Sequence, residues 1–371
     1  MSSLHQSEET LQNLVASVTP VDARWLPRAR GRLDSLTKPP GSLGRLEEIA
    51  ARVACVQEDL RPSVDRKRIV MMAADHGVVA EGVSPYPQDV TWQMVQNFAR
   101  GGAAINQLAK SVNAELALVD IGVAADLSAM DGVVHDNLAR GTANIAEGSA
   151  MSRDLCARAV LLGARIARIA ASEGIQLIGT GEMGIGNTTS AAALTCAFTG
   201  ADPEVVTGPG TGLDEAGVAR KVAVIRRALD VNARLLTDPL GTLAALGGLE
   251  IAGLAGVVIG AAASRTAVVV DGFISGVAGL AALRLCPACA GFVFPSHRSA
   301  EPGHGAVLDA LGLKSVLDLD MRLGEGTGAA LAFGIIDAAC RMMSGMATFA
   351  EAGVSPADDA PSPPRGQRIA P

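Results

Sequence analysis

Short apolar segments alternate with amphipathic helical patterns along most of the chain. The apolar segments span residues 68–75, 115–122, 175–184, 266–272 and 291–296. Helical spacing marks residues 152–174 and 214–229, which lie between these segments. Strands that are buried on both faces are continuously apolar, and helices between them make parallel crossover connections. The sequence therefore predicts an α/β fold, with a parallel-sheet, Rossmann-like, three-layer domain.

The region before residue 66 has a different pattern. Leucine, isoleucine and valine recur every three or four residues from Leu43 to Val56, which predicts an amphipathic helix. We expect residues 1–65 to be the N-terminal helical part of a smaller domain, with the C-terminal segment as a candidate for its remainder. Residues 66–350 are then the α/β catalytic domain. The proline-rich residues 355–371 are expected to be a disordered tail.

Composition limits the partners. Hydrophobic residues make up 49% of the chain and charged residues 19%, which suits a large buried core. The net charge is −7 and aromatic residues are only 3%, so the basic, aromatic face that binds nucleic acid is not expected. The most apolar stretch, residues 244–263, contains Glu250 and several glycines. We interpret it as a buried helix or helix pair rather than a membrane span.

The six cysteines are scattered, and the polar first residues lack the apolar core of a signal peptide. Both features lead us to expect reduced thiols and a cytoplasmic protein. Cys286 and Cys289 form the one CxxC pair, without a second pair or nearby histidines at zinc-binding spacing. We expect these cysteines to be structural or incidental.

A glycine-rich loop at residues 179–194 follows a predicted strand and opens a helix at Asn187, Thr188 and Thr189. Asparagine and threonine cap helices, and the N–H groups of a helix N-terminus bind phosphate. An ordinary glycine turn with a helix cap is the alternative. Glu182 inside the loop favours a functional role, because a structural turn has little need of a carboxylate.

A second glycine-rich turn lies within residues 206–221, again before a predicted helix. Lys221 falls in that helix and is within reach of a phosphate held by the turn. Taken alone, Lys221 also fits a solvated surface lysine.

Two further polar segments follow predicted strands. Asp75 and His76 fit either hydrogen-bonded structural roles or a metal or acid–base site, although the carboxylates that a metal site needs are not evident nearby. Ser296 and His297 suggest a nucleophile pair, but adjacent residues do not by themselves form one, and the nucleophile-elbow motif is missing. We prefer a polar loop that contacts substrate.

Glu325 has a glycine on each side and precedes a strongly apolar helix. Loss of water around this carboxylate would raise its pKa, as a general base near neutral pH requires. A negative charge that complements the helix dipole is the alternative. Spacing alone does not separate the two.

Six segments together resemble one family. They read LTKPPGSLGRLE, AADHGVVAEGVSPYPQDVT, GTGEMGIGNTT, GPGTGLD, SHRSAEPGHG and RLGEGTGAALA, in order from Leu36 to Ala332. Their combination is similar to that of the nicotinate-nucleotide:dimethylbenzimidazole phosphoribosyltransferases of cobalamin biosynthesis. The resemblance implies transfer of ribose 5-phosphate from nicotinate mononucleotide to 5,6-dimethylbenzimidazole. The products would be α-ribazole 5′-phosphate and nicotinate, with inversion at the anomeric carbon.

The resemblance also implies site residues. Glu325 matches the catalytic carboxylate of the family and Glu182 its second functional glutamate. The implied substrate-binding residues are Gln88, Met183, Gly184, Ile185, Gly186, Asn187, Thr188, Thr189, Gly208, Gly210, Thr211, Gly212, Lys221, Ser299 and Leu323. Among them, Gln88, Met183 and Leu323 would border the base pocket. The family is homodimeric, and the resemblance implies no metal or other cofactor.

The residues are compatible with this chemistry, because nicotinate leaves as a neutral ring and a single base suffices for the incoming benzimidazole. Two other functions stay open at this point. One is a metal-dependent phosphoesterase that uses Asp75, His76 and His297. The other is a non-catalytic nucleotide-binding subunit, which would keep the glycine loops but have no use for Glu182 and Glu325.

Overall fold

The structure is a computed structural model that describes residues 2–210 and 212–355. The chain forms two compact units. One unit comprises Met1–Pro20 and Arg66–Phe333, and the other comprises Val21–Asp65 and the residues from Gly334 onward. All but the first residue of the predicted tail, 355–371, lies outside the described residues.

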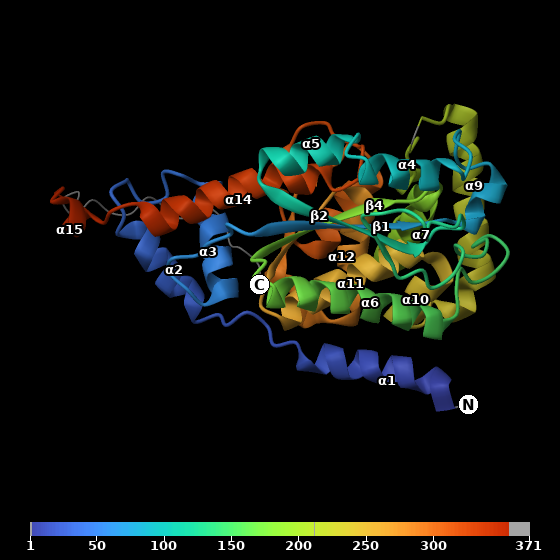
Figure 1. Ribbon diagram of the computed structural model, residues 1–371, viewed down its shortest axis with the longest axis horizontal. Coiled ribbons are helices and arrows are strands. Elements are labelled where there is room, and N and C mark those ends of the chain that lie inside the picture. The colour runs from blue at the N-terminus through green and yellow to red at the C-terminus, as the bar shows by residue number, and fades with distance from the viewer. Residues whose placement is uncertain (1, 211, 356–371) are drawn as a thin grey trace. The chain divides into compact units, whose positions relative to one another are not determined.

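A six-stranded parallel sheet is the centre of the larger unit (Figure 1). Its order is β3-β2-β1-β4-β5-β6. The strands are β1 (Lys67–Ala74), β2 (Ala114–Gly122), β3 (Val133–His135), β4 (Leu177–Met183), β5 (Ala267–Val270) and β6 (Val293–Pro295). The five predicted strands match β1, β2, β4, β5 and β6, and the predicted α/β class is confirmed. The short β3 was missed, because three residues are too few to show a pattern.

The strand order reverses between β1 and β4. From β1 the chain continues outward to β2 and β3, and from β4 it continues in the other direction to β5 and β6. In open parallel sheets, ligands bind beyond the carboxyl ends of the strands at such a switch point. The loops that follow β1, β4, β5 and β6 all reach this edge.

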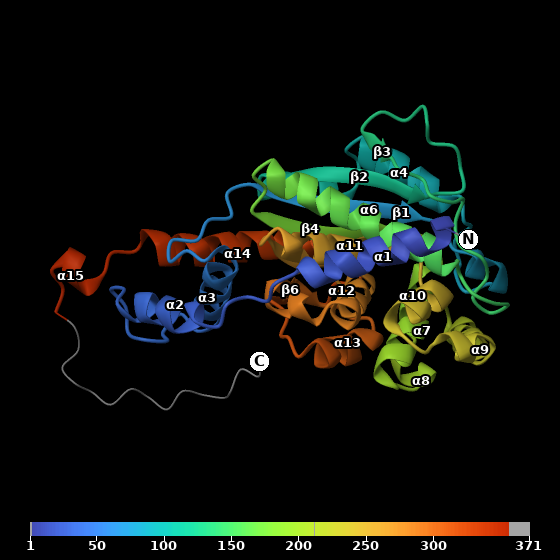
Figure 2. The same ribbon diagram turned by 90° about the horizontal axis from the view of Figure 1, so that it is seen from below.

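Helices cover both faces of the sheet (Figures 1 and 2). On one side lie α4 (Val90–Ala99), α5 (Ala104–Ser111) and the first turns of α14 (Thr327–Gly345), and on the other lie α6 (Arg153–Ser172), α11 (Leu249–Ala263) and α12 (Phe273–Leu285). Gly179 in β4 lets Phe333 of α14 pack directly on the strand, since a Cβ there would approach the Phe333 ring to 2.8 Å. These helices complete the predicted three layers.

The apolar stretch at residues 244–263 forms parts of two buried helices, α10 (Pro239–Leu246) and α11, which meet at Gly247 and Gly248. The expected helix pair is therefore confirmed. Gly256 and Gly260 of α11 lie against the backbone of α6, so the two helices approach more closely than larger side chains would allow. No helix within residues 2–210 and 212–355 combines the length and apolar character that a bilayer crossing needs.

The larger unit contains further helices, a second pair of strands and short turns. They are α1 (Ser2–Ser17), α7 (Asn187–Thr199), α8 (Pro203–Val206), α9 (Glu215–Asn232), α13 (Gly303–Leu311), β7 (His297–Arg298), β8 (Leu317–Asp318) and three 3₁₀ turns (Gly77–Glu81, Ala233–Leu235 and Pro287–Phe292). The pair β7–β8 is a separate two-stranded parallel sheet that the sequence did not reveal.

The smaller unit contains α2 (Trp25–Asp34), α3 (Arg45–Gln57), the second part of α14 and α15 (Phe349–Ala352). Ser344 Oγ donates to the Pro62 carbonyl at 2.7 Å, and an antiparallel bridge joins Leu36 to Thr348. N- and C-terminal segments thus build the helical unit together. Its limits differ from the predicted ranges 1–65 and 66–350, because residues 1–20 belong to the sheet unit and the chain from 334 onward belongs to the helical unit.

Candidate active site

Glu325 lies in a strained turn directly before α14. Gly324, Glu325 and Gly326 all have positive φ angles, of 83°, 62° and 77°. This conformation is uncommon for a residue with a side chain, and such strain is concentrated at functional sites. A side chain at Gly324 would overlap the Glu182 carboxylate, and one at Gly326 would come within 2.9 Å of Ile69 Cγ2. The glycines therefore let the turn lie directly on β4 and present Glu325 beside Glu182.

Asp271, the residue after β5, holds the same turn. Its Oδ2 accepts from the Gly326 N–H at 3.1 Å and its Oδ1 from the Ala329 N–H at 3.0 Å. Asp271 thus supplies the negative charge that the N-terminus of α14 favours. This arrangement weakens the alternative in which Glu325 serves only as the helix-end charge. Sequence reasoning missed Asp271, although its position after an apolar strand was a usable signal.

Both glutamates are buried carboxyls with raised pKa values. Burial raises the pKa of Glu325 to about 7, and the Asp271 charge contributes. Burial also raises the pKa of Glu182 to about 8, with further repulsion from Glu250 and Asp271. An amide hydrogen bond from Asn187 opposes the shift at Glu182. Near neutral pH the pair can therefore hold one proton, with Glu325 as the more readily ionised member.

Lys221 on α9 is 1% exposed, so its interpretation as a surface lysine is wrong. Its Nζ donates to Thr188 Oγ1 at 2.8 Å and to the Gly208 carbonyl at 3.4 Å. Burial lowers the pKa of Lys221 to about 8, against an opposing effect from Glu301. Burial makes the charged form of Lys221 costly, and the Glu301 carboxylate offsets only part of that cost, which favours a site that can also receive an anion. Lys221 joins the two glycine-rich loops at that site.

The backbone of the 184–189 loop offers less to an anion than its sequence suggested. The Ile185 N–H donates to Thr91 Oγ1 at 3.1 Å. The Asn187 and Thr189 N–H groups donate to the carbonyls of Gly184 and Gly186, at 3.1 and 3.0 Å. The Thr188 hydroxyl, which Lys221 contacts, is therefore the better-placed group of this loop.

The glycine turn at 208–212 is held by two charged residues that sequence reasoning missed. Arg322 Nη1 donates to the Gly210 carbonyl at 2.9 Å. Glu301 is buried, and burial raises its pKa while Lys221 and Arg322 oppose the shift. A Cβ at Gly208 would overlap the Glu301 carboxylate, so glycine is required there. Gly212 has a φ of 123°, and Thr211 lies outside the described residues.

Ser299 makes hydrogen bonds within the loop that carries Glu301. Its N–H donates to His304 Nδ1 at 2.8 Å, and its Oγ accepts from the Glu301 N–H at 3.2 Å. Ser299 therefore fixes the loop that carries Glu301. Ser296 Oγ and His297 Nδ1 are 2.9 Å apart, closer than expected for adjacent residues, but both side chains are buried.

The loop after β1 packs against the glycine-rich loop that follows β4, since a Cβ at Gly186 would lie 2.8 Å from Val79 Cγ2. His76 Nε2 is 2.6 Å from Glu250 Oε1, and His76 Nδ1 is 3.1 Å from Ser190 Oγ. This buried link ties the loop to α7 and α11, which supports the hydrogen-bonded role expected for His76. In the sequence, Glu250 is the one charged residue of the apolar stretch 244–263. A charge in such a stretch indicates a buried partner, which is His76. Across residues 2–210 and 212–355, no three side chains of the metal-ligating types gather at one point.

Three of the predicted base-pocket residues have accessible side chains. Gln88 is half-buried and faces the Asp75 carboxyl, whose pKa burial raises while Gln88 and Thr91 oppose the shift. Met183 is half-buried at the end of β4, and Leu323 is 58% exposed. Together with the exposed Tyr86 they offer apolar and amide groups to a ligand rather than a set of buried aromatic rings.

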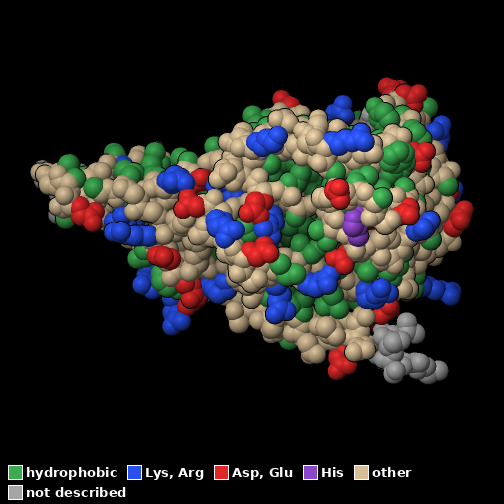
Figure 3. Space-filling model, viewed as in Figure 1, with side chains coloured by type: hydrophobic (Ala, Val, Ile, Leu, Met, Phe, Trp, Pro, Cys, Tyr) green, Lys and Arg blue, Asp and Glu red, His purple; other side chains and the backbone are tan. Residues whose placement is uncertain are grey.

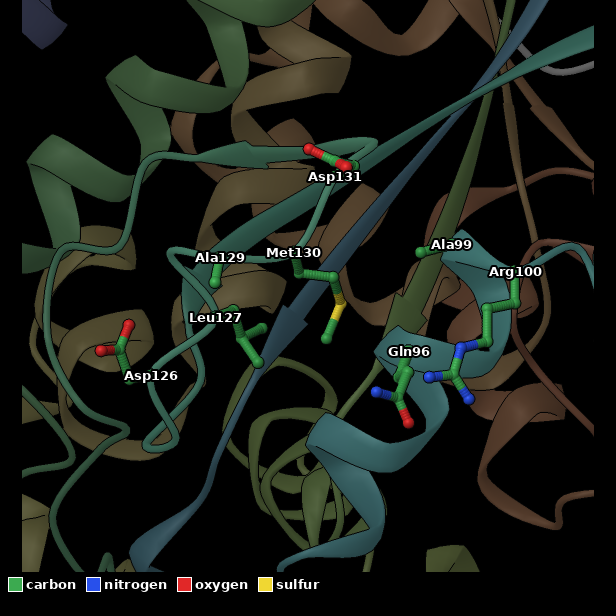
Figure 4. A pocket seen from close by; sticks show the side chains of 8 residues that line it. All are labelled: Gln96, Ala99, Arg100, Asp126, Leu127, Ala129, Met130 and Asp131. Carbon is green, nitrogen blue, oxygen red and sulfur yellow. The ribbon is translucent and has the colours of Figure 1, made fainter.

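All six cysteines are buried, and no two of them are joined by a disulfide. A hollow of about 430 Å³ lies between α4 and residues 126–131 (Figure 4). It is lined by Gln96, Ala99, Arg100, Asp126, Leu127, Ala129, Met130 and Asp131, and none of the predicted site residues is among them. On the face drawn in Figure 3, acidic and basic side chains are interspersed, without a continuous basic surface.

Comparisons with known proteins identify the family of the chain. The DBI_PRT phosphoribosyltransferase family matches residues 18–354. The nicotinate-nucleotide–dimethylbenzimidazole phosphoribosyltransferase of Chloroflexus aggregans is 53% identical over 345 residues, covering 93% of this chain and 98% of that protein. The enzyme of the same name from Nitratidesulfovibrio vulgaris strain DP4 is 52% identical, covering 94% and 99%.

Solved structures give the same result. The crystal structure of CobT from Thermus thermophilus has a TM-score of 0.86 at 48% identity, covering 90% of this chain and 99% of that one. A structure titled as the nicotinate-nucleotide–dimethylbenzimidazole phosphoribosyltransferase of the same organism has a TM-score of 0.85 at 47% identity, covering 91% and 100%. The family expected from the motifs is confirmed: this chain belongs to the nicotinate-nucleotide–dimethylbenzimidazole phosphoribosyltransferases.

Proposed function

We propose that the protein transfers the phosphoribosyl group of nicotinate mononucleotide to 5,6-dimethylbenzimidazole. The products are nicotinate and α-ribazole 5′-phosphate, a precursor of the cobalamin lower ligand. The proposal rests on one observation. Two buried carboxyls with pKa values near neutral pH lie at the same edge of the sheet as a buried lysine that can bind an anion. Family membership identifies the substrates that such a site would take.

The reaction asks little of the protein beyond one base and accurate positioning. Nicotinate departs from the anomeric carbon as a neutral ring and takes the bonding electrons with it. A ring nitrogen of the benzimidazole attacks the same carbon from the opposite face, which converts the β-linkage to an α-linkage. The other ring nitrogen loses its proton. Holding both rings in line can account for much of the rate.

Glu325 is the proposed base for that proton. Its pKa of about 7 leaves a useful fraction ionised at neutral pH and matches the requirement for general-base catalysis. Glu182, with a pKa of about 8, keeps its proton in the same range. Neighbouring carboxyls whose pKa values differ can take different roles. Glu182 therefore stays neutral beside the ionised Glu325 and limits the repulsion between them.

The ribose phosphate is proposed to bind between the two glycine-rich loops. Lys221 Nζ and Thr188 Oγ1 already contact each other there, and Arg322 reaches the Gly210 carbonyl from the turn that bears Glu325. A phosphate at this point places the anomeric carbon toward the carboxyl pair. Gln88, Met183 and Leu323 are proposed to border the benzimidazole, which suits a ring held by apolar and amide contacts.

The activity is expected to follow a bell-shaped pH profile. The basic form of Glu325 accumulates as pH rises through about 7, so kcat/KM should rise there. Lys221 loses its charge above about 8, and the nucleotide phosphate then loses its cation, so kcat/KM should fall. Steady-state assays between pH 5.5 and 10, roughly one unit or more beyond each limb, measure both.

Lys221→Arg is the matched variant, because arginine keeps its charge throughout this range. It should move the alkaline limb to higher pH and leave the acid limb near 7. An alkaline limb that does not move would assign it to another group, with Glu182 the first candidate.

The function itself is tested by incubating the purified protein with nicotinate mononucleotide and 5,6-dimethylbenzimidazole. We expect nicotinate and α-ribazole 5′-phosphate in equal amounts, with the α-anomer identified by NMR. Free nicotinate without the coupled product would indicate a hydrolase, and no turnover would indicate a binding subunit. Added chelator should not change the rate.

We further propose that the protein acts as a homodimer, as its family resemblance implies. Sedimentation equilibrium in the micromolar range should give twice the mass of the chain. A mass equal to that of one chain, in a preparation that is fully active, would exclude the proposal.

A further inference from the structure

Asp271 takes no part in the proposed chemical step, yet the turn that carries Glu325 depends on it. It lies immediately after β5, in the layer beneath the turn. Its own N–H donates to Thr180 Oγ1 on β4 at 3.3 Å, which fixes its backbone. Its carboxylate then accepts from Gly326 and Ala329, on both sides of the first residues of α14.

We propose that Asp271 is a positioning residue that acts through Glu325, by holding the left-handed turn at 324–326 and by presenting the charge of its ionised carboxylate to Glu325. The inference rests on the proposed role of Glu325 as the base. It goes further by assigning the orientation and strength of that base to a residue that follows β5, more than fifty positions earlier in the chain.

The geometry supports the positioning role. The positive φ of Glu325, 62°, is an unfavourable conformation for a residue with a side chain, and the surroundings must impose it, while the flanking glycines adopt positive φ without cost. Close packing against Gly181 and Ile69 imposes it from below. The two hydrogen bonds to Asp271 impose it from the helix side. A one-ångström displacement of a catalytic group can lower a rate about 10²-fold, so this support matters for turnover.

The charged groups around Asp271 determine how its replacement should change the pKa of Glu325. Glu325 faces it from the turn, and Glu182 faces it from β4. On the other side His297 Nδ1 is 3.7 Å from Asp271 Oδ1, and Glu250 on α11 acts on Glu182 from further along the edge. Burial raises the pKa of Asp271, while His297 and the N–H groups of residues 326 and 329 oppose the shift. An ionised Asp271 makes proton loss from Glu325 harder and so makes the Glu325 carboxylate a stronger base.

The test is the variant Asp271→Asn, alone and combined with Glu325→Gln. Asparagine keeps the shape and one oxygen acceptor but removes the charge. We expect kcat to fall about 10²-fold, with nucleotide affinity by calorimetry unchanged. The acid limb of the kcat profile should move at least about one unit to lower pH, because a like charge near Glu325 has been removed. A structural weakening alone would lower kcat without moving that limb.

The double variant separates the mechanisms. If Asp271 acts through Glu325, adding Asp271→Asn to Glu325→Gln should cause almost no further loss. Losses that multiply, an acid limb that stays in place, or an unchanged kcat would each overturn the inference. Asp271→Ser, a smaller side chain with one oxygen acceptor, goes through the same cycle in case the asparagine variant does not fold. The wild-type protein in the same assay reports on the proposed function separately, because its activity does not depend on the cycle.

Discussion

Replacing Glu325 by glutamine is expected to lower kcat by about 10²–10⁴-fold, the usual contribution of a positioned general base. Glutamine has nearly the same shape and cannot accept the benzimidazole proton. The raised pKa of Glu325, about 7, is the physical basis of its role, because a normal carboxylate would be a much weaker base. Steady-state kinetics with both substrates measure the loss, and the KM for nicotinate mononucleotide should change little.

Two comparison variants sharpen this result. Glu182→Gln should cost less, because a neutral amide replaces a carboxyl that is already protonated near pH 7. Glu9→Gln, on the exposed surface of α1, should have no effect. A larger loss at Glu182 than at Glu325 would reverse the assignment of the two carboxyls.

Replacing Gly256 by alanine is expected to destabilise the protein by about 3 kcal/mol. Gly256 of α11 lies directly against the Val160 backbone of α6, and a methyl group there would overlap the Val160 carbonyl. The two helices must then separate, and both are part of the layer under the sheet. A decrease in Tm of roughly 5–10 °C is the expected result in a thermal scan.

Gly305→Ala is the matched control, since it also adds one methyl group to a helical glycine. Nothing lies within 4 Å of a Cβ at Gly305 in α13. The gain in helix propensity of about 1 kcal/mol should therefore leave Tm unchanged or slightly higher. Equal decreases in the two variants would show that glycine flexibility, rather than the contact between α6 and α11, determines the effect.

Strand positions were predictable from the sequence because the parallel sheet is buried on both faces. Residues 69–74 are a continuous apolar run within the predicted segment 68–75, and β1 occupies Lys67–Ala74. The division of the chain was harder to predict. Helix α1 has no sequence feature that distinguishes it from α2 and α3, and it packs against α6 and α11 of the larger unit. Tertiary contacts decide which partner a helix face packs against, and the spacing of apolar residues in the sequence does not predict them.

The candidate site shows a similar limit. Glycines around Glu325 marked an unusual backbone, and the positive φ angles there explain them. The sequence did not decide whether Lys221 is a surface residue or a site residue, because the spacing of a helix does not show which loops a lysine side chain contacts. Asp271, Glu301 and Arg322 act by bridging segments far apart in the chain, so their partners were invisible before the fold was known.

The central claim is that Glu325 removes the proton of the incoming base, and chemical rescue tests it most directly. The measurement is the single-turnover rate of transfer by Glu325→Ala as a function of formate concentration at neutral pH. The account predicts a rate about 10²–10⁴-fold below wild type that rises with formate, while binding of nicotinate mononucleotide stays unchanged. A single-turnover rate within about tenfold of wild type without formate would contradict it.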